Sequence, residues 1–128
     1  MPASSAQLQT LKAEFFRALA HPIRIRLLEV LVSRPCSVQE LQRTLDIGQP
    51  IVSQQLARLR ASGVVVAAKS GAATRYSVTD PLLKELLAVA KQILNRRLVD
   101  VQALLRELER DRGAAAPLRA RRSRSGTR

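Results

Sequence analysis

The sequence predicts a mainly α-helical fold of about five helices with a single two-stranded hairpin. Apolar residues make up 46% of the 128 residues, and in several segments they recur at helical spacing. Aromatic residues make up only 2% of the chain, so the core must consist of Leu, Val, Ile and Ala, which suits packed helices. Two short β-branched runs around a glycine-containing loop interrupt the helical pattern and predict the hairpin.

Two helices are expected before residue 33. Residues 7–20 place apolar side chains at helical spacing. Pro22 ends this helix, because proline lacks the N–H that a helix interior needs, and it suits the first turn of the next helix, residues 22–32. His21 is the only histidine, and at this junction a capping or packing role is more ordinary than a metal ligand.

The third and fourth helices form the most informative stretch. Ser37 and Glu40 have the spacing of a capping box, which predicts a helix over about 38–45. Residues 46–48 form a tight turn, and the fourth helix runs from Gln49 or Pro50 to Ala61. Two short helices around a tight turn, the second polar on one side, are the layout of a helix-turn-helix DNA reader.

The hairpin and a long final helix complete the predicted domain. Residues 64–69 and 74–78 form the hairpin, which directly after a helix-turn-helix is a "wing". The last helix covers about 81–110, with Asp80 as N-cap. Its apolar stripe is longer than so small a domain can cover, so its outer part is expected to pack on a second copy. We predict one domain over residues 1–112 and a disordered, Arg-rich tail over 113–128.

The charge of the chain indicates its partner. The chain carries 22 Lys and Arg against 10 Asp and Glu, a net charge of +12. A polyanion is therefore expected, and duplex DNA fits the predicted geometry. The scarcity of aromatic rings disfavours single-stranded nucleic acid, which binds by stacking. The arginines of the tail either reach along neighbouring DNA or form a solubilising end.

The DNA-contacting residues are expected on the outward side of the fourth helix and in the wing. Gln side chains pair with adenine and Arg with guanine in the major groove, while Lys and Arg of a wing suit phosphates. The simpler alternative is a solvated polar surface. We expect Ile51 and Val52 to face the core and Gln55 to lie at its edge. The candidates are Gln49, Pro50, Ser53, Gln54, Arg58, Lys69, Thr74 and Arg75.

Metal, cofactor and enzyme functions are not expected. The single cysteine, Cys36, excludes an internal disulfide and an all-cysteine metal site. It precedes a helix N-terminus, a position that can activate a thiol, although a small buried side chain is the simpler interpretation. The acids of the last helix, Asp100, Glu107 and Glu109, alternate with arginines and suggest helical ion pairs. The chain lacks a Gly-rich phosphate loop and a paired-acid cleft.

The order of elements and three motifs resemble the ArsR family of bacterial winged-helix repressors over about residues 10–108. The motifs are FFRALAHPIRIRLLEVL (15–31), VQELQRTLDIGQPIVSQQLARLRASGVV (38–65) and GAATRYSVTD (71–80). Metal-sensing members often carry a Cys-x-Cys in the third helix, at positions occupied here by Ser37 and Gln39. The resemblance implies a homodimer built from the first and last helices. The expected interface residues are Leu8, Leu11, Phe15, Leu86, Ile93, Leu94, Leu98, Val101 and Leu105.

These observations predict a sequence-specific, DNA-binding transcriptional regulator that binds an inverted repeat as a homodimer. We expect it to act as a repressor. Without a secretion signal or a long apolar run it is expected in the cytoplasm, at the nucleoid. An effector that releases it is not identified, and the residues support neither a metal nor a thiol-reactive ligand. The alternative is a nucleoid-associated protein of low sequence specificity, and a third reading is a protein-interaction module that keeps the winged helix as scaffold.

Overall fold

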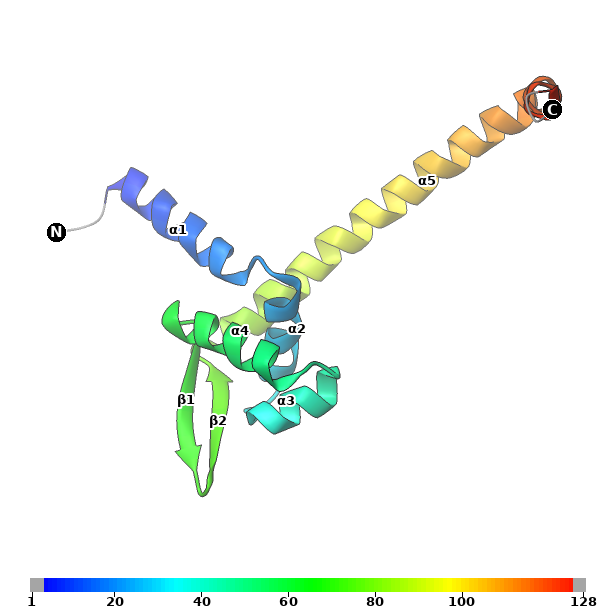
Figure 1. Cartoon of the computed structure of the whole chain (residues 1–128). Coiled ribbons are helices and arrows are strands. Elements are labelled where there is room, and N and C mark those ends of the chain that lie inside the picture. The colour runs from blue at the N-terminus through cyan, green and yellow to red at the C-terminus, as the bar shows by residue number, and fades with distance from the viewer. Residues whose placement is uncertain (1–3, 126–128) are drawn as a thin grey trace. The chain divides into compact units, whose positions relative to one another are not determined.

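The computed structural model describes the backbone of residues 4–125 and the side chains of residues 4–113. The fold class is confirmed, since the described part holds five helices and one two-stranded sheet (Figure 1). The first four helices begin and end within two residues of the predicted positions. The elements are α1 (Ser5–Leu19), α2 (Pro22–Leu31), α3 (Val38–Leu45), α4 (Gln49–Ala61), β1 (Val65–Ser70), β2 (Ala73–Val78) and α5 (Leu82–Ser125).

The chain forms two compact units, Met1–Leu87 and Ala88–Arg128. The first holds α1 to α4, the hairpin and the start of α5, so this division falls earlier than the predicted boundary at residue 112. The helix α5 also continues past residue 110 and overlaps the predicted tail. The disorder of residues 113–128 stays a prediction, and residues 126–128 lie outside the described part. None of the described helices has an apolar stretch of membrane-spanning length.

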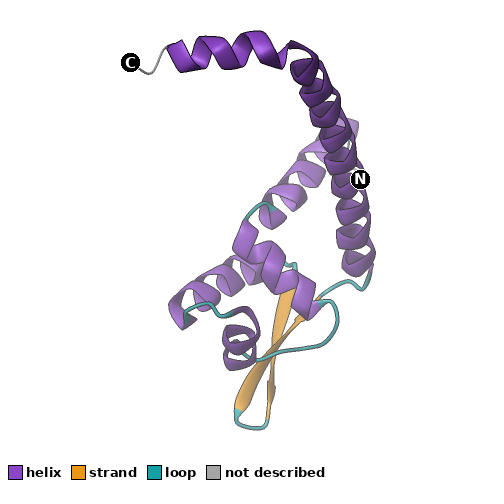
Figure 2. Ribbon diagram, turned by 90° about the vertical axis from the view of Figure 1, so that its right-hand side faces the viewer, coloured by secondary structure: helices purple, strands orange, loops and turns teal. Residues whose placement is uncertain are grey.

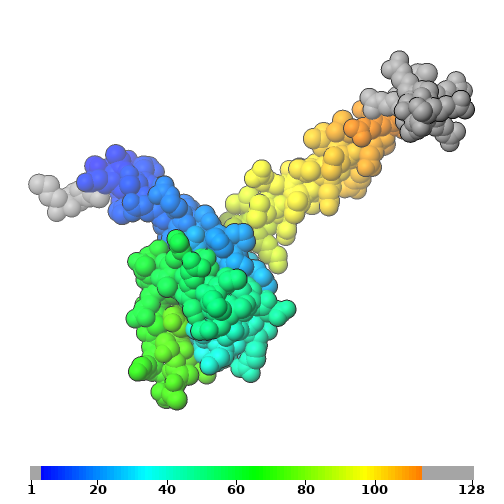
Figure 3. Space-filling model, viewed as in Figure 1, coloured from blue at the N-terminus to red at the C-terminus, as the bar shows by residue number. Residues whose placement is uncertain are grey.

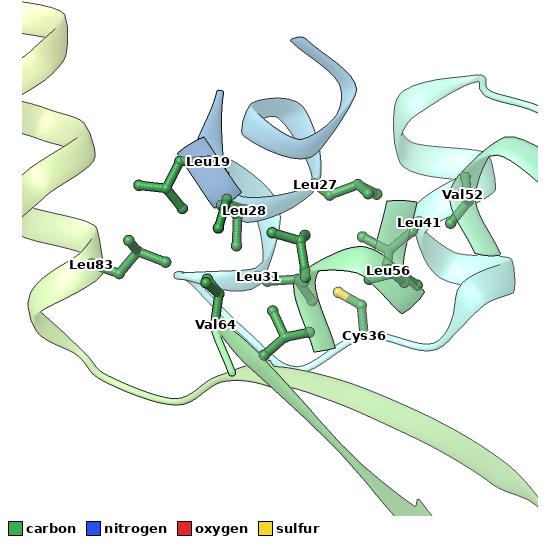
Figure 4. Packing of buried hydrophobic residues seen from close by; sticks show 13 residues of the cluster. Leu19, Leu27, Leu28, Leu31, Cys36, Leu41, Val52, Leu56, Val64 and Leu83 are labelled. Atoms are coloured by element: carbon green, nitrogen blue, oxygen red, sulfur yellow. The ribbon is translucent and has the colours of Figure 1, made fainter. Parts of the chain in front are cut away.

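The core of the first unit is aliphatic, as the composition predicts. Leu27 of α2, Leu41 of α3 and Leu59 of α4 are completely buried, and Leu83 at the start of α5 packs into the same cluster (Figure 4). Burial of each such side chain contributes about 1.5–3 kcal/mol. The expectation for Ile51 was wrong: it is 47% exposed, because it lies at the edge of the apolar stripe of α4.

Polar side chains close the ends of three helices. The Nδ1 atom of His21 accepts a hydrogen bond of 3.1 Å from the second residue of α2, which confirms the capping role of the histidine. Arg24 donates to the carbonyl of Ala18 near the end of α1, at 2.9 Å. Arg26 donates to the carbonyl of Leu45 at the end of α3, at 2.8 Å. These carbonyls have no partner within their helices, so the two arginines of α2 hold its neighbours in place.

The turn between α3 and α4 depends on one left-handed residue. Asp46 has φ 53° and ψ 51°, and its N–H donates to the carbonyl of Gln42. Aspartate visits this conformation more readily than most residues. Gly48, the N-cap of α4, has an ordinary φ of −61°. The aspartate and not the glycine therefore redirects the chain from one helix into the next.

The hairpin is joined by its base to the segment before α3. β1 and β2 pair antiparallel, with Lys69 opposite Thr74. Cys36 donates its N–H to the carbonyl of Tyr76 at 3.0 Å, and Tyr76 donates back to Cys36 at 2.8 Å. The rest of the hairpin projects from the helices as a narrow two-stranded ribbon (Figure 2), with Gly71 in the left-handed conformation at its turn. The hairpin is therefore a wing with a fixed base.

Candidate nucleic-acid interface

The predicted contact residues of α4 lie together on its exposed side. Gln49, Pro50, Gln54 and Arg58 are exposed and Ser53 is half-buried, while Val52, Leu56 and Leu59 on the other side of the helix pack into the core. Gln49 donates to the hydroxyl of Ser53 at 3.4 Å. Positions three and four apart share one side of a helix, so α4 presents a continuous polar surface of amide, hydroxyl and guanidinium groups.

The wing residues are exposed as well, but their charges differ. Lys69, Thr74 and Arg75 are all exposed, on strands that extend beyond the helices (Figure 3). The guanidinium of Arg75 lies 3.1 Å from the Oε1 atom of Glu40 in α3. Lys69 makes no ion pair with any described side chain. One of the two wing cations is therefore already matched by a carboxylate.

A hollow of about 820 Å³ separates the helix-turn-helix from the wing. It brings Gln49 of α4 and Thr74 of the wing to one site. Gln39 and Gln42 of α3 also line it, and sequence reasoning missed both. The available signal was their three-residue spacing on the polar side of α3, the first helix of the helix-turn-helix. No acidic residue is among the lining residues, so the hollow offers neutral hydrogen-bonding groups.

The buried glutamine of α4 has a structural role. Gln55 is 8% exposed, which places it at the edge of the core as predicted. Its Oε1 atom has no hydrogen-bond partner among the described residues. Since it points away from the polar surface of α4, it takes no part in the candidate interface.

Cys36 is buried and not activated. The thiol is 0% exposed, and its nearest polar partner is the carbonyl of Arg34 at 3.6 Å. Burial raises the pKa of the thiol above its ordinary value, and the charge of Arg34 only partly opposes this. The thiol is therefore protonated at neutral pH, which confirms the interpretation as a small buried side chain.

The acids of α5 form no cluster. Among the described side chains, no group of three His, Cys, Asp or Glu residues is placed to hold a metal ion. The ion pairs predicted along α5 are also not formed within residues 82–113, where the structure gives no contact between acid and arginine. The single ion pair of the described side chains is that between Arg75 and Glu40.

The apolar residues predicted for the dimer interface are mostly exposed. Leu11 of α1 is 57% exposed and Leu98 of α5 is 58% exposed. Phe16, Val99 and Leu104 share this exposure without having been predicted. Leu86 differs, because it is partly buried against the core of its own chain.

Comparison with known proteins identifies the family. The pattern of bacterial regulatory proteins of the arsR family matches residues 21–66. The chain is 51% identical over 106 residues to the HTH-type transcriptional regulator Rv0081 of Mycobacterium tuberculosis, and the match covers 81% of this chain and 92% of that protein. The chain belongs to the arsR family. It is accordingly a DNA-binding transcriptional regulator.

Solved structures of two similar regulators share the fold. The crystal structure of Rv0081 matches with a TM-score of 0.66 at 48% identity, covering 77% of this chain and 97% of that chain. The transcriptional repressor BigR from Xylella fastidiosa matches with a TM-score of 0.61 at 31% identity, covering 71% and 96%. These matches confirm the winged helix-turn-helix.

Proposed function

We propose that this arsR-family regulator is a repressor that binds an inverted-repeat operator as a homodimer at the nucleoid, with α4 in the major groove and the wing beside it. The observation that carries the proposal is the polar surface of α4 next to the neutral hollow. Repression is the role named for BigR, which this chain resembles at 31% identity. Gln54 and Arg58 are the side chains best suited to base edges.

The hollow supports this docking geometry. A major groove and its neighbouring minor groove are separated by one sugar–phosphate strand. A helix in the first and a wing at the second must therefore leave room for that strand between them. The hollow between α4 and the wing offers this room, and Gln39, Gln42 and Thr74 along it are of the type that donates hydrogen bonds to phosphate oxygens.

The exposed apolar side chains support the homodimer. Leu8 and Leu11 of α1 are 47% and 57% exposed, and Ile93 and Leu98 of α5 are 54% and 58% exposed. Exposed apolar side chains gathered on one helix are typical of protein–protein contacts, and a second copy presents the same residues on both helices. Two-fold symmetry then places two α4 helices about 34 Å apart, in successive major grooves.

Selection from a random duplex pool tests the sequence specificity. A specific regulator enriches an inverted repeat and holds it at least about a thousandfold more tightly than random duplex. If no motif is enriched while all duplexes bind, the chain is the nucleoid-associated protein of low specificity. If no duplex binds even at low salt, both DNA-binding hypotheses are refuted and the chain is a protein-interaction module.

Arg58 provides the sharpest single-residue test of the docking. We expect Arg58→Ala to weaken binding to the selected operator by about 1–3 kcal/mol and to relax the base preference at one position of each half-site. The matched control is Lys84→Ala, which removes one positive charge from an exposed position of α5. Competition binding on the operator and its single-base variants is the measurement, and equal effects of both variants would refute the contact.

A further inference from the structure

The carboxylate of Glu40 does not make the capping contact that its sequence motif predicts. The N–H of Glu40 donates to the hydroxyl of Ser37 at 3.2 Å, which is half of a capping box. The second bond of the box, in which the carboxylate accepts from the N–H of Ser37, is not formed. The Oε1 atom instead accepts from the Ser37 hydroxyl at 3.4 Å and lies 3.1 Å from the guanidinium of Arg75.

The backbone fixes this ion pair. Arg75 is the neighbour of Tyr76, and Ser37 is the neighbour of Cys36; the two hydrogen bonds between Tyr76 and Cys36 join these segments. The carboxylate side chain is 25% exposed and the guanidinium side chain 44% exposed. The packing of the wing on α3 therefore brings the two side chains within reach of each other.

Glu40 changes the charge that the wing presents. Lys69 and Arg75 are the wing's two cations, and the carboxylate compensates the second of them. Binding to DNA of arbitrary sequence depends on the free positive charge that meets the phosphates. Binding to an operator depends in addition on base contacts. The carboxylate lowers the free charge for both kinds of binding, but because it also restrains Arg75, it penalises most the sites whose phosphate strand lies elsewhere.

We propose that Glu40 is a specificity-determining residue that restrains Arg75 and suppresses binding to non-operator DNA. The proposal rests on the proposed function, because it concerns the same DNA surface. Specificity is a difference between two affinities, and Glu40 increases that difference by lowering the affinity for the wrong partner. It also holds Arg75 in one position beside the hollow, ready for the phosphate strand of the correct site.

Four variants of the full chain test this inference: Glu40→Gln, Arg75→Gln, the double variant and Glu29→Gln. Glu29 is an exposed acid of α2, so its variant changes the net charge equally without freeing Arg75. We expect Glu40→Gln to bind random duplex about three- to tenfold more tightly and to steepen its salt dependence by about one unit. The operator affinity changes less than about twofold, so the specificity ratio falls at least about threefold.

The controls separate the possible outcomes. In the Arg75→Gln background the effect of Glu40→Gln must disappear, because no guanidinium is left to free. Equal behaviour of Glu40→Gln and Glu29→Gln would show a net-charge effect only and overturn the inference. Equal weakening on operator and random duplex would show a structural role and overturn it too. If Glu40→Gln does not fold by circular dichroism, Glu40→Asp, which keeps the charge but shortens the reach, must change the ratio in the same direction.

Failure of the inference differs visibly from failure of the proposed function. If the natural chain selects an operator but Glu40→Gln leaves the specificity ratio unchanged, only the role of Glu40 is refuted. If the natural chain binds no duplex at low salt, both are refuted together.

Discussion

Solvent exposure separates two groups of apolar side chains: those of the helix-turn-helix, and those of α1 and the outer part of α5. Leu41 and Leu59 of the first group are 0% exposed, whereas Leu11 and Leu98 of the second are 57% and 58% exposed. The leucines are chemically identical, so sequence spacing alone does not distinguish them. The difference indicates that the helix-turn-helix is stabilised within its own chain, whereas in the proposed homodimer the exposed side chains of α1 and α5 pack on a second copy.

The largest expected effect concerns the buried group. Leu56→Ala removes a side chain that is 1% exposed, and we expect the free energy of unfolding to fall by about 2–5 kcal/mol because a cavity remains. Leu82→Ala, at a position 62% exposed, is the control and is expected to cost less than about 1 kcal/mol. Urea unfolding at one protein concentration measures both, and similar losses would abolish the contrast between buried and exposed leucines.

The next effect concerns the exposed group. Leu98→Glu introduces a charge into the predicted dimer surface, and we expect the chain to sediment as a monomer with unchanged helix content. Operator affinity should fall by about a hundredfold or more, because two linked half-sites are no longer bound together. Gln92→Glu adds the same charge at an exposed polar position of α5 and should stay dimeric. A dimeric Leu98→Glu variant would show that this stripe does not carry the interface.

The smallest expected effect concerns the buried thiol of Cys36. Burial raises the folded-state pKa of this thiol above its ordinary value of 9.0, so the unfolded chain loses its proton first. The contribution of Cys36 to stability is therefore intact below pH about 9 and declines as the pH rises above it. At pH 8 we expect alkylation by iodoacetamide to be slower than in urea by about a hundredfold or more.

An added exposed thiol provides the reference for this measurement. Ser33 is exposed in the same loop, so Ser33→Cys should be alkylated rapidly at its new cysteine in the folded state. Equal rates for the two thiols would contradict the burial of Cys36.

Local signals in the sequence predicted most of the fold, and tertiary contacts account for what was missed. Helix ends followed from caps such as His21 and Asp80, whose bonds join residues two apart. The second half of the capping box failed because the partner of Glu40 is Arg75, far along the chain. Gln39 and Gln42 were missed because the hollow exists only once the wing folds beside α3. The partial burial of Leu86 likewise depends on packing that periodicity does not specify.

The hydrogen bonds between Cys36 and Tyr76 have a mechanical consequence. A ribbon anchored at one end bends like a cantilever, with an amplitude that grows toward Gly71 at its tip. In the proposed docking, this would let the tip follow minor grooves of different width while α4 keeps its alignment with the bases. Amide hydrogen exchange along β2 should register this as a gradient, slowest beside the anchor and fastest at the turn.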